Sequence, residues 1–258
     1  MNRKRKSVGL ALGAGSVRGF AHIGVLMALT EANIPIDYVA GSSVGSLIGA
    51  AICSGLSIDQ ILDLAKQFRW TRIIRPTWWS DGLVSFAPME VFINKFMDTP
   101  RFETLSTPLA VVATDIDRDE AVVITQGAVA PAVRGSCSVP GLVSPTPWEG
   151  RRLADGVLVN AVPVSVAREM GAEYVIGVDV LKPSLRPSWG FISHLVNALE
   201  IALRHSGGGT ENADCLITPD IGGFSYLRYA KRDELIRHGK QATEEKIPEI
   251  RRNIFGDG

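Results

Sequence analysis

The sequence predicts an α/β fold built around a mostly parallel central sheet. Short apolar segments that suit buried strands alternate with helical segments along the 258 residues. Strands of a parallel sheet covered by helices on both faces are apolar in this way. Turns rich in glycine and serine follow the first two of these strands. Because no internal repeat or linker interrupts the alternation, we predict a single domain over residues 8–258, preceded by a basic head at residues 1–7.

The first part of the chain supplies two strands and three helices. Residues 8–12 form an apolar run that ends at glycines, which predicts a buried strand. Residues 18–30 are apolar on nearly every face of a helix, so this helix is expected in the centre of the fold. A second strand at residues 36–40 leads into a helix at 43–53 that is rich in Ala, Gly and Ile. The helix expected at residues 58–68 is more amphipathic.

The middle of the chain is expected to hold fewer regular elements. Apolar runs at residues 110–114 and 121–125 predict two strands around the acidic turn at 115–120. A short helix is expected at residues 129–134. The three prolines between residues 140 and 147 then predict a long loop.

The last third returns to alternating elements. A helix at residues 163–170 precedes a β-branched strand at 174–180. The next helix is expected at residues 191–205, where the glycines that follow end it, and a short strand at 215–218 comes after them. Residues 228–246 form a charged, amphipathic pattern that predicts a closing helix on the surface.

Composition excludes several classes of protein. The 27 Lys and Arg residues balance 27 Asp and Glu residues, so the chain lacks the basic excess of a nucleic-acid-binding protein. Its three cysteines (Cys53, Cys137 and Cys215) form no pair or cluster, which argues against a disulfide scaffold and against structural zinc. We therefore expect a reducing compartment, the cytoplasm. No apolar run approaches the length that a transmembrane helix needs.

The basic head has two further interpretations. Its four cations, Arg3 to Lys6, precede an apolar stretch and so mimic a short secretory signal. The glycine pair Gly13 and Gly15, with Arg18 soon after, fits a strand running into a loop better. We expect the head to be solvated, with weak attraction to anionic lipid as the alternative.

The first chemical motif is Gly41-Ser42-Ser43-Val44-Gly45, a G-x-S-x-G sequence. It lies between an expected strand and an expected helix, which is the context of a nucleophile elbow. Glycines relieve crowding in such a sharp turn, and the helix N-terminus directs free N–H groups at the serine. The motif predicts Ser43 as a nucleophile, while an ordinary Gly/Ser helix cap is the alternative.

A second glycine-rich turn runs from Gly13 to Gly19 and also joins a strand to a helix. Exposed N–H groups at such a turn bind negative charge, as an acyl-transfer enzyme needs for its oxyanion. A dinucleotide-binding loop is the rival interpretation. A dinucleotide-binding loop has the spacing G-x-G-x-x-G, which is one residue shorter than the spacing from Gly13 to Gly19. The acid that binds the ribose in such a loop lies at the end of the second strand, whereas Asp37 lies at the start of that strand here.

The third motif is Asp155-Gly156, which taken alone indicates only a turn. A serine nucleophile, however, needs a base. His194 or His205 would complete a Ser–Asp–His triad, but both fall within an expected helix. A carboxylate with a pKa near ~3.9 is a poor base in water, yet in a water-poor pocket it can accept a proton directly. The other histidines are His22, expected as a satisfied polar group in the core, and His238, expected in solvent.

The order of these three motifs resembles the patatin-like phospholipase family, and most closely its bacterial branch related to neuropathy target esterase. The runs from Arg18 to Leu26 and from Arg134 to Pro140 are especially similar, and the resemblance covers residues 8–180. It implies a three-layer α/β/α fold and a Ser–Asp dyad without any metal or other cofactor. Ser43 would be the nucleophile and Asp155 its base.

The resemblance also implies an oxyanion hole and a substrate. The backbone N–H groups of Gly15, Ser16 and Arg18 would bind the oxyanion, and the motif glycines are Gly13, Gly19, Gly41, Gly45 and Gly156. The reaction would be hydrolysis of phospholipid or lysophospholipid esters through an acyl-serine. Ala14, Ser16 and Val157 depart from the family pattern, and Val157 adds bulk beside the base. A non-lipid esterase or acyltransferase and a catalytically weak regulatory member are the alternatives.

Residues 69–87 are expected to be irregular, and contact with lipid is expected within them, at residues 69–86. Trp70, Trp78 and Trp79 alternate there with arginines, and both residue types suit a membrane–water interface. We predict peripheral contact with the inner membrane face through these tryptophans. The alternative is that the rings belong to the core or to a subunit contact. The sequence indicates no oligomeric state.

Overall fold

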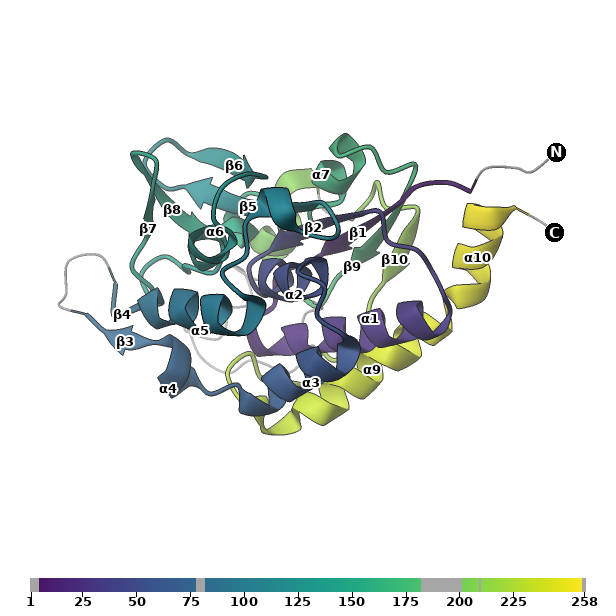
Figure 1. Ribbon diagram of the computed structural model, residues 1–258, viewed down its shortest axis with the longest axis horizontal. Helices are drawn as coiled ribbons and strands as arrows, with labels where there is room; N and C mark the ends of the chain where they lie inside the picture. Colours follow the sequence, from purple (N-terminus) through teal and green to yellow (C-terminus); the bar gives the residue numbers. More distant parts are fainter. Residues whose placement is uncertain (1–4, 78–81, 182–200, 209, 257–258) are drawn as a thin grey trace.

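A computed structural model describes residues 5–77, 82–181, 201–208 and 210–256 (Figure 1). The centre of its mixed β-sheet consists of five parallel strands in the order β10-β9-β1-β2-β5. These are β1 (Val8–Leu12), β2 (Tyr38–Ser42), β5 (Leu109–Asp115), β9 (Tyr174–Val178) and β10 (Cys215–Ile217). The parallel part of the prediction is therefore confirmed, and β2 runs two residues further than expected, to Ser42.

Antiparallel strands extend this sheet beyond β5. They are β6 (Glu120–Ile124), β7 (Thr146–Trp148) and β8 (Arg151–Asp155). The prediction of a loop around the prolines was wrong for β7, and β8 was not predicted. Pro147 lies inside β7, the last strand in the sheet order, and proline is tolerated in edge strands because one side of such a strand needs no ladder bond.

The two faces of the sheet carry side chains of different size. Leu10, Leu12 and Val39 point into a large apolar core on one face. Ala11 and Ala40, which alternate with them, face a smaller core on the other side. This period of two is the alternation of a β-strand, and the small residues let a helix approach closely.

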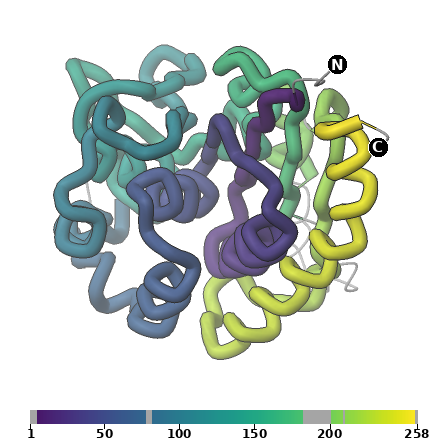
Figure 2. The backbone as a smooth tube through the Cα atoms, turned by 45° about the vertical axis from the view of Figure 1, so that its right-hand side comes forward, coloured from purple at the N-terminus to yellow at the C-terminus, as the bar shows by residue number. Residues whose placement is uncertain are grey.

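Helices cover both faces, which confirms the three-layer arrangement (Figures 1 and 2). The layer over the large core includes α1 (Phe20–Glu31), α2 (Val44–Cys53), α3 (Ile58–Gln67) and α9 (Arg232–Glu244). On the opposite face, α7 (Val164–Glu169) packs on β1, β2 and β9. The central position expected for α1 is confirmed, because nine of its twelve residues are buried.

Close packing of α1 on α9 explains two glycines. A Cβ atom built on Gly24 would lie 1.9 Å from the carbonyl oxygen of Ile236, and one on Gly239 would lie 2.0 Å from that of Ala21. The two helices lie side by side in Figure 2. The closing helix ends sooner than expected, and a separate α10 (Ile247–Phe255) follows, since Pro248 does not fit the interior of a longer helix.

Further elements lie in the middle of the chain. The α5 helix (Ala87–Met97), which the sequence did not predict, packs on α6 (Val129–Ser136). The segment at residues 69–87, expected to be irregular, contains α4 (Trp70–Ile73) and the two-stranded sheet of β3 (Arg75–Pro76) and β4 (Val84–Ser85). The expected helix at residues 191–205 lies mostly outside the described residues, although 201–204 are helical.

Candidate active site

Ser43 occupies a sharp turn between β2 and α2. Its φ of 52° and ψ of −126° lie where non-glycine residues are rarely found, and such a backbone conformation costs about 1–3 kcal/mol. The flanking glycines allow the turn to pack. A Cβ on Gly41 would lie 2.5 Å from the Cα of Ser46, and one on Gly45 would lie 2.1 Å from the carbonyl oxygen of Leu12. The predicted strand–turn–helix context of the motif is therefore present.

Asp155 reaches Ser43 because β2 and β8 share one edge of β5. Val111 of β5 pairs with β2 and with β6, whereas Ala113, two residues later, pairs with β8 and with β6. Since β6 occupies the opposite edge throughout, β8 follows β2 along the same edge. The two strands run in opposite directions, so their C-terminal ends meet. The Ser43 hydroxyl donates a hydrogen bond of 2.8 Å to Oδ2 of Asp155.

Both side chains are shielded from water. Ser43 is 8% exposed and Asp155 is 1% exposed. Burial raises the pKa of Asp155 from 3.8 to about 7, against the opposing effect of hydrogen bonds from the Val157 N–H and the Ser43 hydroxyl. A carboxylate with a pKa near neutrality is a better proton acceptor than an ordinary aspartate.

Backbone and hydroxyl groups hold the pair in place. The Ser43 N–H donates to Oγ of Ser136 at 2.8 Å, and that hydroxyl donates to the Val112 carbonyl at 2.6 Å. On the other side, the Asp155 N–H donates to the Ser138 carbonyl at 2.8 Å. The sequence assigned no role to Ser136 or Ser138, although both lie in the segment that resembles the family.

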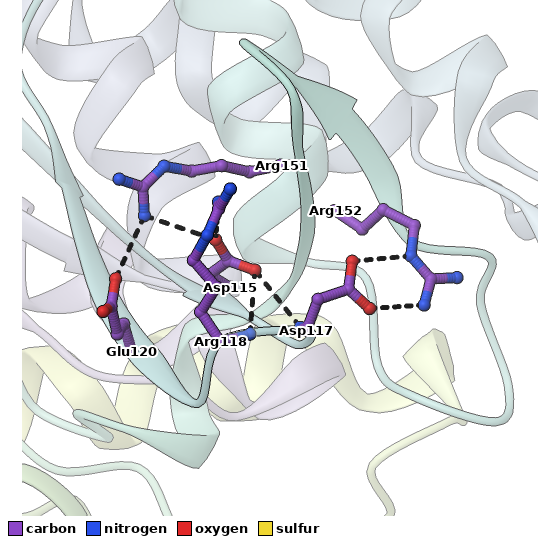
Figure 3. A network of polar contacts seen from close by, with 6 residues as sticks. All are labelled: Asp115, Asp117, Arg118, Glu120, Arg151 and Arg152. Carbon is purple, nitrogen blue, oxygen red and sulfur yellow. Dashed lines mark hydrogen bonds and ion pairs between the residues drawn. The ribbon is translucent and has the colours of Figure 1, made fainter.

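A network of charged groups fixes the start of β8 (Figure 3). Arg151 donates to Asp115 of β5 at 3.3 Å, and Arg118 donates to the same carboxylate at 2.8 Å. Arg152 donates to both carboxylate oxygens of Asp117, through Nε and Nη2. Asp115 itself is fully buried. Because β8 has only three paired positions with β5, this network contributes to the register that brings Asp155 to Ser43.

The glycine-rich turn lies against the loop that carries Ser43. A Cβ on Gly19 would lie 2.4 Å from Cγ1 of Val44, the residue after Ser43. Within the described part of the chain, the N–H groups of Gly15 and Ser16 have no acceptor. The Arg18 N–H, by contrast, donates to the Gly15 carbonyl at 3.1 Å. Two of the three predicted oxyanion donors are thus available as the turn stands.

The Arg18 side chain and Ser16 anchor this turn to a distant segment. The Arg18 guanidinium is buried and donates to the Phe224 carbonyl at 3.0 Å and to the Tyr226 hydroxyl at 2.6 Å. Ser16, with a φ of 49°, donates through its hydroxyl to the Tyr226 carbonyl at 2.8 Å. Ser16 thus adopts a positive φ, which usually favours glycine, and its hydroxyl makes a hydrogen bond that compensates.

The other two departures from the family pattern pack together. Ala14 and Val157 belong to one small apolar cluster with Ala161 and Leu181. The backbone N–H of Val157 donates to Oδ1 of Asp155 at 2.9 Å. Val157 thus supports the carboxylate through its backbone while its side chain is buried beside Ala14. Gly156 is required by close approach, because a Cβ there would lie 2.2 Å from the Val112 carbonyl oxygen.

None of the histidines in the described residues bonds to Ser43 or Asp155. His22 is buried and donates from Nε2 to the Gly13 carbonyl at 2.8 Å. Burial lowers its pKa to about 4, so it is neutral at physiological pH. His205 is exposed, and His238, expected in solvent, is half-buried and packs edge-on against Phe224. His194 lies outside the described residues.

Comparison with known proteins identifies the family. Residues 10–168, more than half of the chain, match the sequence model described as "Patatin-like phospholipase". The chain belongs to this family. It is 35% identical over 182 residues to patatin-like phospholipase domain-containing protein 7 of Rattus norvegicus, which covers 67% of this chain and 14% of the rat protein. It is 32% identical over 176 residues to an uncharacterized NTE family protein of Mycobacterium bovis, which covers 67% of this chain and 49% of that protein.

The predicted family and its branch related to neuropathy target esterase are thereby confirmed. Neuropathy target esterase sws of Drosophila melanogaster is 34% identical over 182 residues, and the match covers 67% of this chain and 13% of that protein. The chain therefore spans only a small part of these animal relatives and about half of the mycobacterial one. As a patatin-like phospholipase family member, it has family support for lipid acyl hydrolysis as its general chemistry.

Solved structures agree on the fold. VipD from Legionella pneumophila matches 95% of this chain and 67% of its own with a TM-score of 0.62 and 13% identity. The type III effector ExoU matches 96% of this chain and 54% of its own with a TM-score of 0.55 and 15% identity. At these identities the likeness concerns the fold alone. Within the described parts of this patatin-like chain, no helix is long and apolar enough to cross a membrane.

The described residues give no support to the predicted tryptophan contact with lipid. Trp70 is half-buried, its ring packs edge-on against Phe68 at 5.2 Å, and its indole N–H donates to the Leu227 carbonyl at 3.0 Å. Trp78 and Trp79 lie outside the described residues. For Trp70, the structure therefore favours the alternative that the ring packs against the protein's own core.

Proposed function

We propose that the chain hydrolyses carboxylic esters of phospholipids or lysophospholipids through an acyl-serine, with Ser43 as nucleophile and Asp155 as base. The observation that carries the proposal is the hydrogen bond of 2.8 Å between these two buried side chains. They come from the two motifs whose order resembles the family, and no histidine in the described residues competes for Ser43.

The chemistry proceeds in two balanced halves. The Ser43 oxygen attacks the ester carbonyl carbon while its proton passes to Asp155, and the carbonyl electrons move to the oxygen. The tetrahedral intermediate then collapses, and the leaving alcohol takes the proton from Asp155. Water attacks the acyl-serine in the second half, with Asp155 again accepting a proton and returning it to Ser43. The products are a fatty acid and the deacylated alcohol.

The oxyanion is proposed to bind the backbone N–H groups of Gly15, Ser16 and Arg18. The N–H groups of Gly15 and Ser16 are available in the present turn, while the Arg18 N–H must first break its hydrogen bond to the Gly15 carbonyl. The first residue of α2, Val44, directs the positive end of that helix at the same place. Removing one oxyanion donor typically lowers the rate about 10²–10³-fold.

Labelling with a fluorophosphonate probe tests this proposal directly. We expect a covalent adduct on Ser43 by peptide mass mapping, no adduct in Ser43→Ala, and much slower labelling in Asp155→Asn. A folded protein that forms no adduct would favour the catalytically weak regulatory alternative. A preference for short, water-soluble esters over micellar long-chain substrates would favour the non-lipid esterase.

The domain and its location complete the proposal. Residues 8–258 are proposed to form one hydrolase domain that acts in the cytoplasm at the inner membrane face. The basic head is partly tied to this domain, since Arg5 binds both carboxylate oxygens of Asp37 at 2.7 and 2.8 Å. Asp37 also accepts the Val8 N–H at 2.7 Å. This acid therefore secures the first strand, and the rival nucleotide-binding role has no support from its contacts.

A further inference from the structure

A groove between α4 and α5 lies outside the dyad and carries an unusual lining. Its volume is about 630 Å³. Three cations, Arg72, Arg75 and Lys95, line it together with the apolar side chains of Ala87, Pro88, Val91, Phe92 and Phe96. No acidic residue is among the described lining residues. A site with positive and apolar walls suits an anionic amphiphile.

The three cations keep their charge available. Within the described part of the chain, none of them has a carboxylate partner. Asp63, which lines a smaller adjoining hollow, pairs with Lys66 at 2.8 Å. Glu90 of α5 pairs with Arg134 at 2.8 Å. Asp63 and Glu90 are thus each paired with a cation that does not line the groove, so they leave the groove positive.

The apolar side of the groove is open to solvent. Val91 is 69% exposed on α5, and the rings of Phe92 and Phe96 lie 4.7 Å apart on the same helix. Exposed apolar side chains beside unpaired cations are typical of surfaces that insert shallowly between lipid headgroups.

Backbone hydrogen bonds connect this groove to the catalytic loop. The strand β3, which contributes Arg75, pairs with β4, and Val84 of β4 donates to the Leu142 carbonyl at 3.1 Å. Leu142 belongs to the loop that begins at Ser138, whose carbonyl accepts the Asp155 N–H. Leu83 and Leu142 are both at least half exposed along this path. A lipid surface seated on the groove would therefore lie beside the loop that supports the base.

We propose that this groove binds the headgroups of anionic phospholipids at a membrane surface. The cations attract the phosphate, while Val91, Phe92 and Phe96 contact the adjoining acyl region. The tie to the catalytic loop rests on the proposed function, but headgroup binding itself requires no catalysis. The site shares Arg72 and Arg75 with the segment predicted to contact lipid, but its apolar wall is on α5, which that prediction did not include, and no tryptophan is among its described lining residues.

Vesicle co-sedimentation of the full chain tests the proposal. The Ser43→Ala protein is used, so that hydrolysis cannot alter the vesicles. We expect tighter binding to phosphatidylcholine vesicles containing about 30% phosphatidylglycerol than to pure phosphatidylcholine. Arg75→Gln with Lys95→Gln should weaken binding about 25-fold, or about fivefold for each cation removed. Val91→Asp should weaken it further.

A matched control removes the same charge elsewhere. Arg237→Gln with Arg252→Gln changes two exposed cations on α9 and α10; α10 lies at the opposite end of the molecule from α4 in Figure 1. We expect binding within about twofold of the parent, since the two charges lie away from the groove. Urea unfolding establishes that each variant is folded, and Lys95→Gln alone serves if the pair is not.

Three outcomes would overturn the proposal. Equal binding to both kinds of vesicle would remove the charge argument, and equal loss in the groove and control pairs would remove the site. Binding of inorganic phosphate without binding to either kind of vesicle would assign the groove to a free phosphate. Labelling of wild-type Ser43 without vesicles reports separately on the proposed hydrolase, so failure of one proposal leaves the other measurable.

Discussion

The Ser136 hydroxyl links the nucleophile turn to the central sheet. It accepts the Ser43 N–H at 2.8 Å and donates to the Val112 carbonyl at 2.6 Å. Ser43 adopts a strained backbone conformation, and such strain persists only where surrounding contacts hold it. We therefore propose that Ser136 positions Ser43, the proposed nucleophile, through the Ser43 backbone N–H.

Replacing Ser136 by alanine should affect both stability and labelling. Ser136→Ala leaves a buried N–H and a buried carbonyl without their partner, which costs about 1–3 kcal/mol of unfolding free energy for such a group. We expect slower fluorophosphonate labelling of Ser43 in the folded variant. Urea unfolding and labelling kinetics measure the two effects.

Ser106→Ala is the matched control for this change. Its hydroxyl donates to the Cys53 carbonyl at 2.8 Å, away from the dyad. We expect a modest loss of stability and an unchanged labelling rate. If the two variants labelled at the same rate, Ser136 would have no positioning role.

The pKa of Asp155 predicts how acylation depends on pH. A base acts in its ionised form, and burial raises the pKa of this carboxyl to about 7. The labelling rate should rise with pH, with a midpoint near 7, and should fall about tenfold for each pH unit well below it. Labelling rates of the wild-type protein, measured at a series of pH values, give this midpoint. A midpoint near 4 would show that Asp155 is not the base or that its pKa is ordinary.

The raised pKa of Asp155 also predicts that stability changes with pH in the direction opposite to the labelling rate. Because the folded pKa lies above the unfolded value near ~3.9, the folded state binds more protons between these two pH values. The free energy of unfolding should therefore fall as pH rises from about 4 to about 7. Asp155→Asn should remove this contribution, so the difference between wild type and variant isolates it. A difference that did not change over this interval would contradict the raised pKa.

Gly45 and Gly49 lie on the same helix but face different neighbours. A Cβ on Gly45 would lie 2.1 Å from a backbone oxygen of Leu12, whereas one on Gly49 would lie 3.1 Å from a methyl group of Val39. Because backbone atoms can shift less than the end of a side chain, Gly45→Ala should lower the free energy of unfolding by about 3 kcal/mol or more. It should also slow labelling of Ser43.

For Gly49→Ala, the gain in helix propensity of about 1 kcal/mol offsets the tight contact. We expect little net change in the urea midpoint and normal labelling. Equal destabilisation by the two substitutions would mean that helix packing in general, and not the nucleophile turn, requires these glycines.

The sequence predicted the parts of the site that depend on local pattern. The turn around Ser43 and the glycine-rich loop each lie between an apolar strand and the start of a helix. This context can be recognised from one short stretch of sequence. The place of Asp155 depends on β8, whose sequence begins with Arg151 and Arg152 and follows a proline-rich stretch. Three paired positions with β5 define this strand, and a strand that short is specified by its neighbours and not by its own pattern.

Contacts between distant segments explain the other omissions. Arg18 was expected to contribute its backbone N–H, but its buried guanidinium bonds to residues more than two hundred positions away. The α5 helix gains its stability by packing on α4 and α6. Its sequence, which begins with Ala87-Pro88, has a helix-compatible start, because proline is favoured in the first turn. That signal could have identified the helix.

The charged network in Figure 3 gives the last prediction, which separates a buried carboxylate from an exposed one. Asp115 is fully buried and binds Arg118 and Arg151, while Asp117 binds Arg152 at the surface. Asp115→Asn removes the charge that both arginines share and loosens the start of β8. Asp117→Asn removes an exposed pair, which usually contributes little. We expect Asp115→Asn to lower the urea midpoint more and to slow labelling of Ser43, because Asp155, its proposed base, ends the same strand. If Asp115→Asn lowered stability but labelled at the wild-type rate with an unshifted pH midpoint, the network would stabilise the sheet without positioning Asp155.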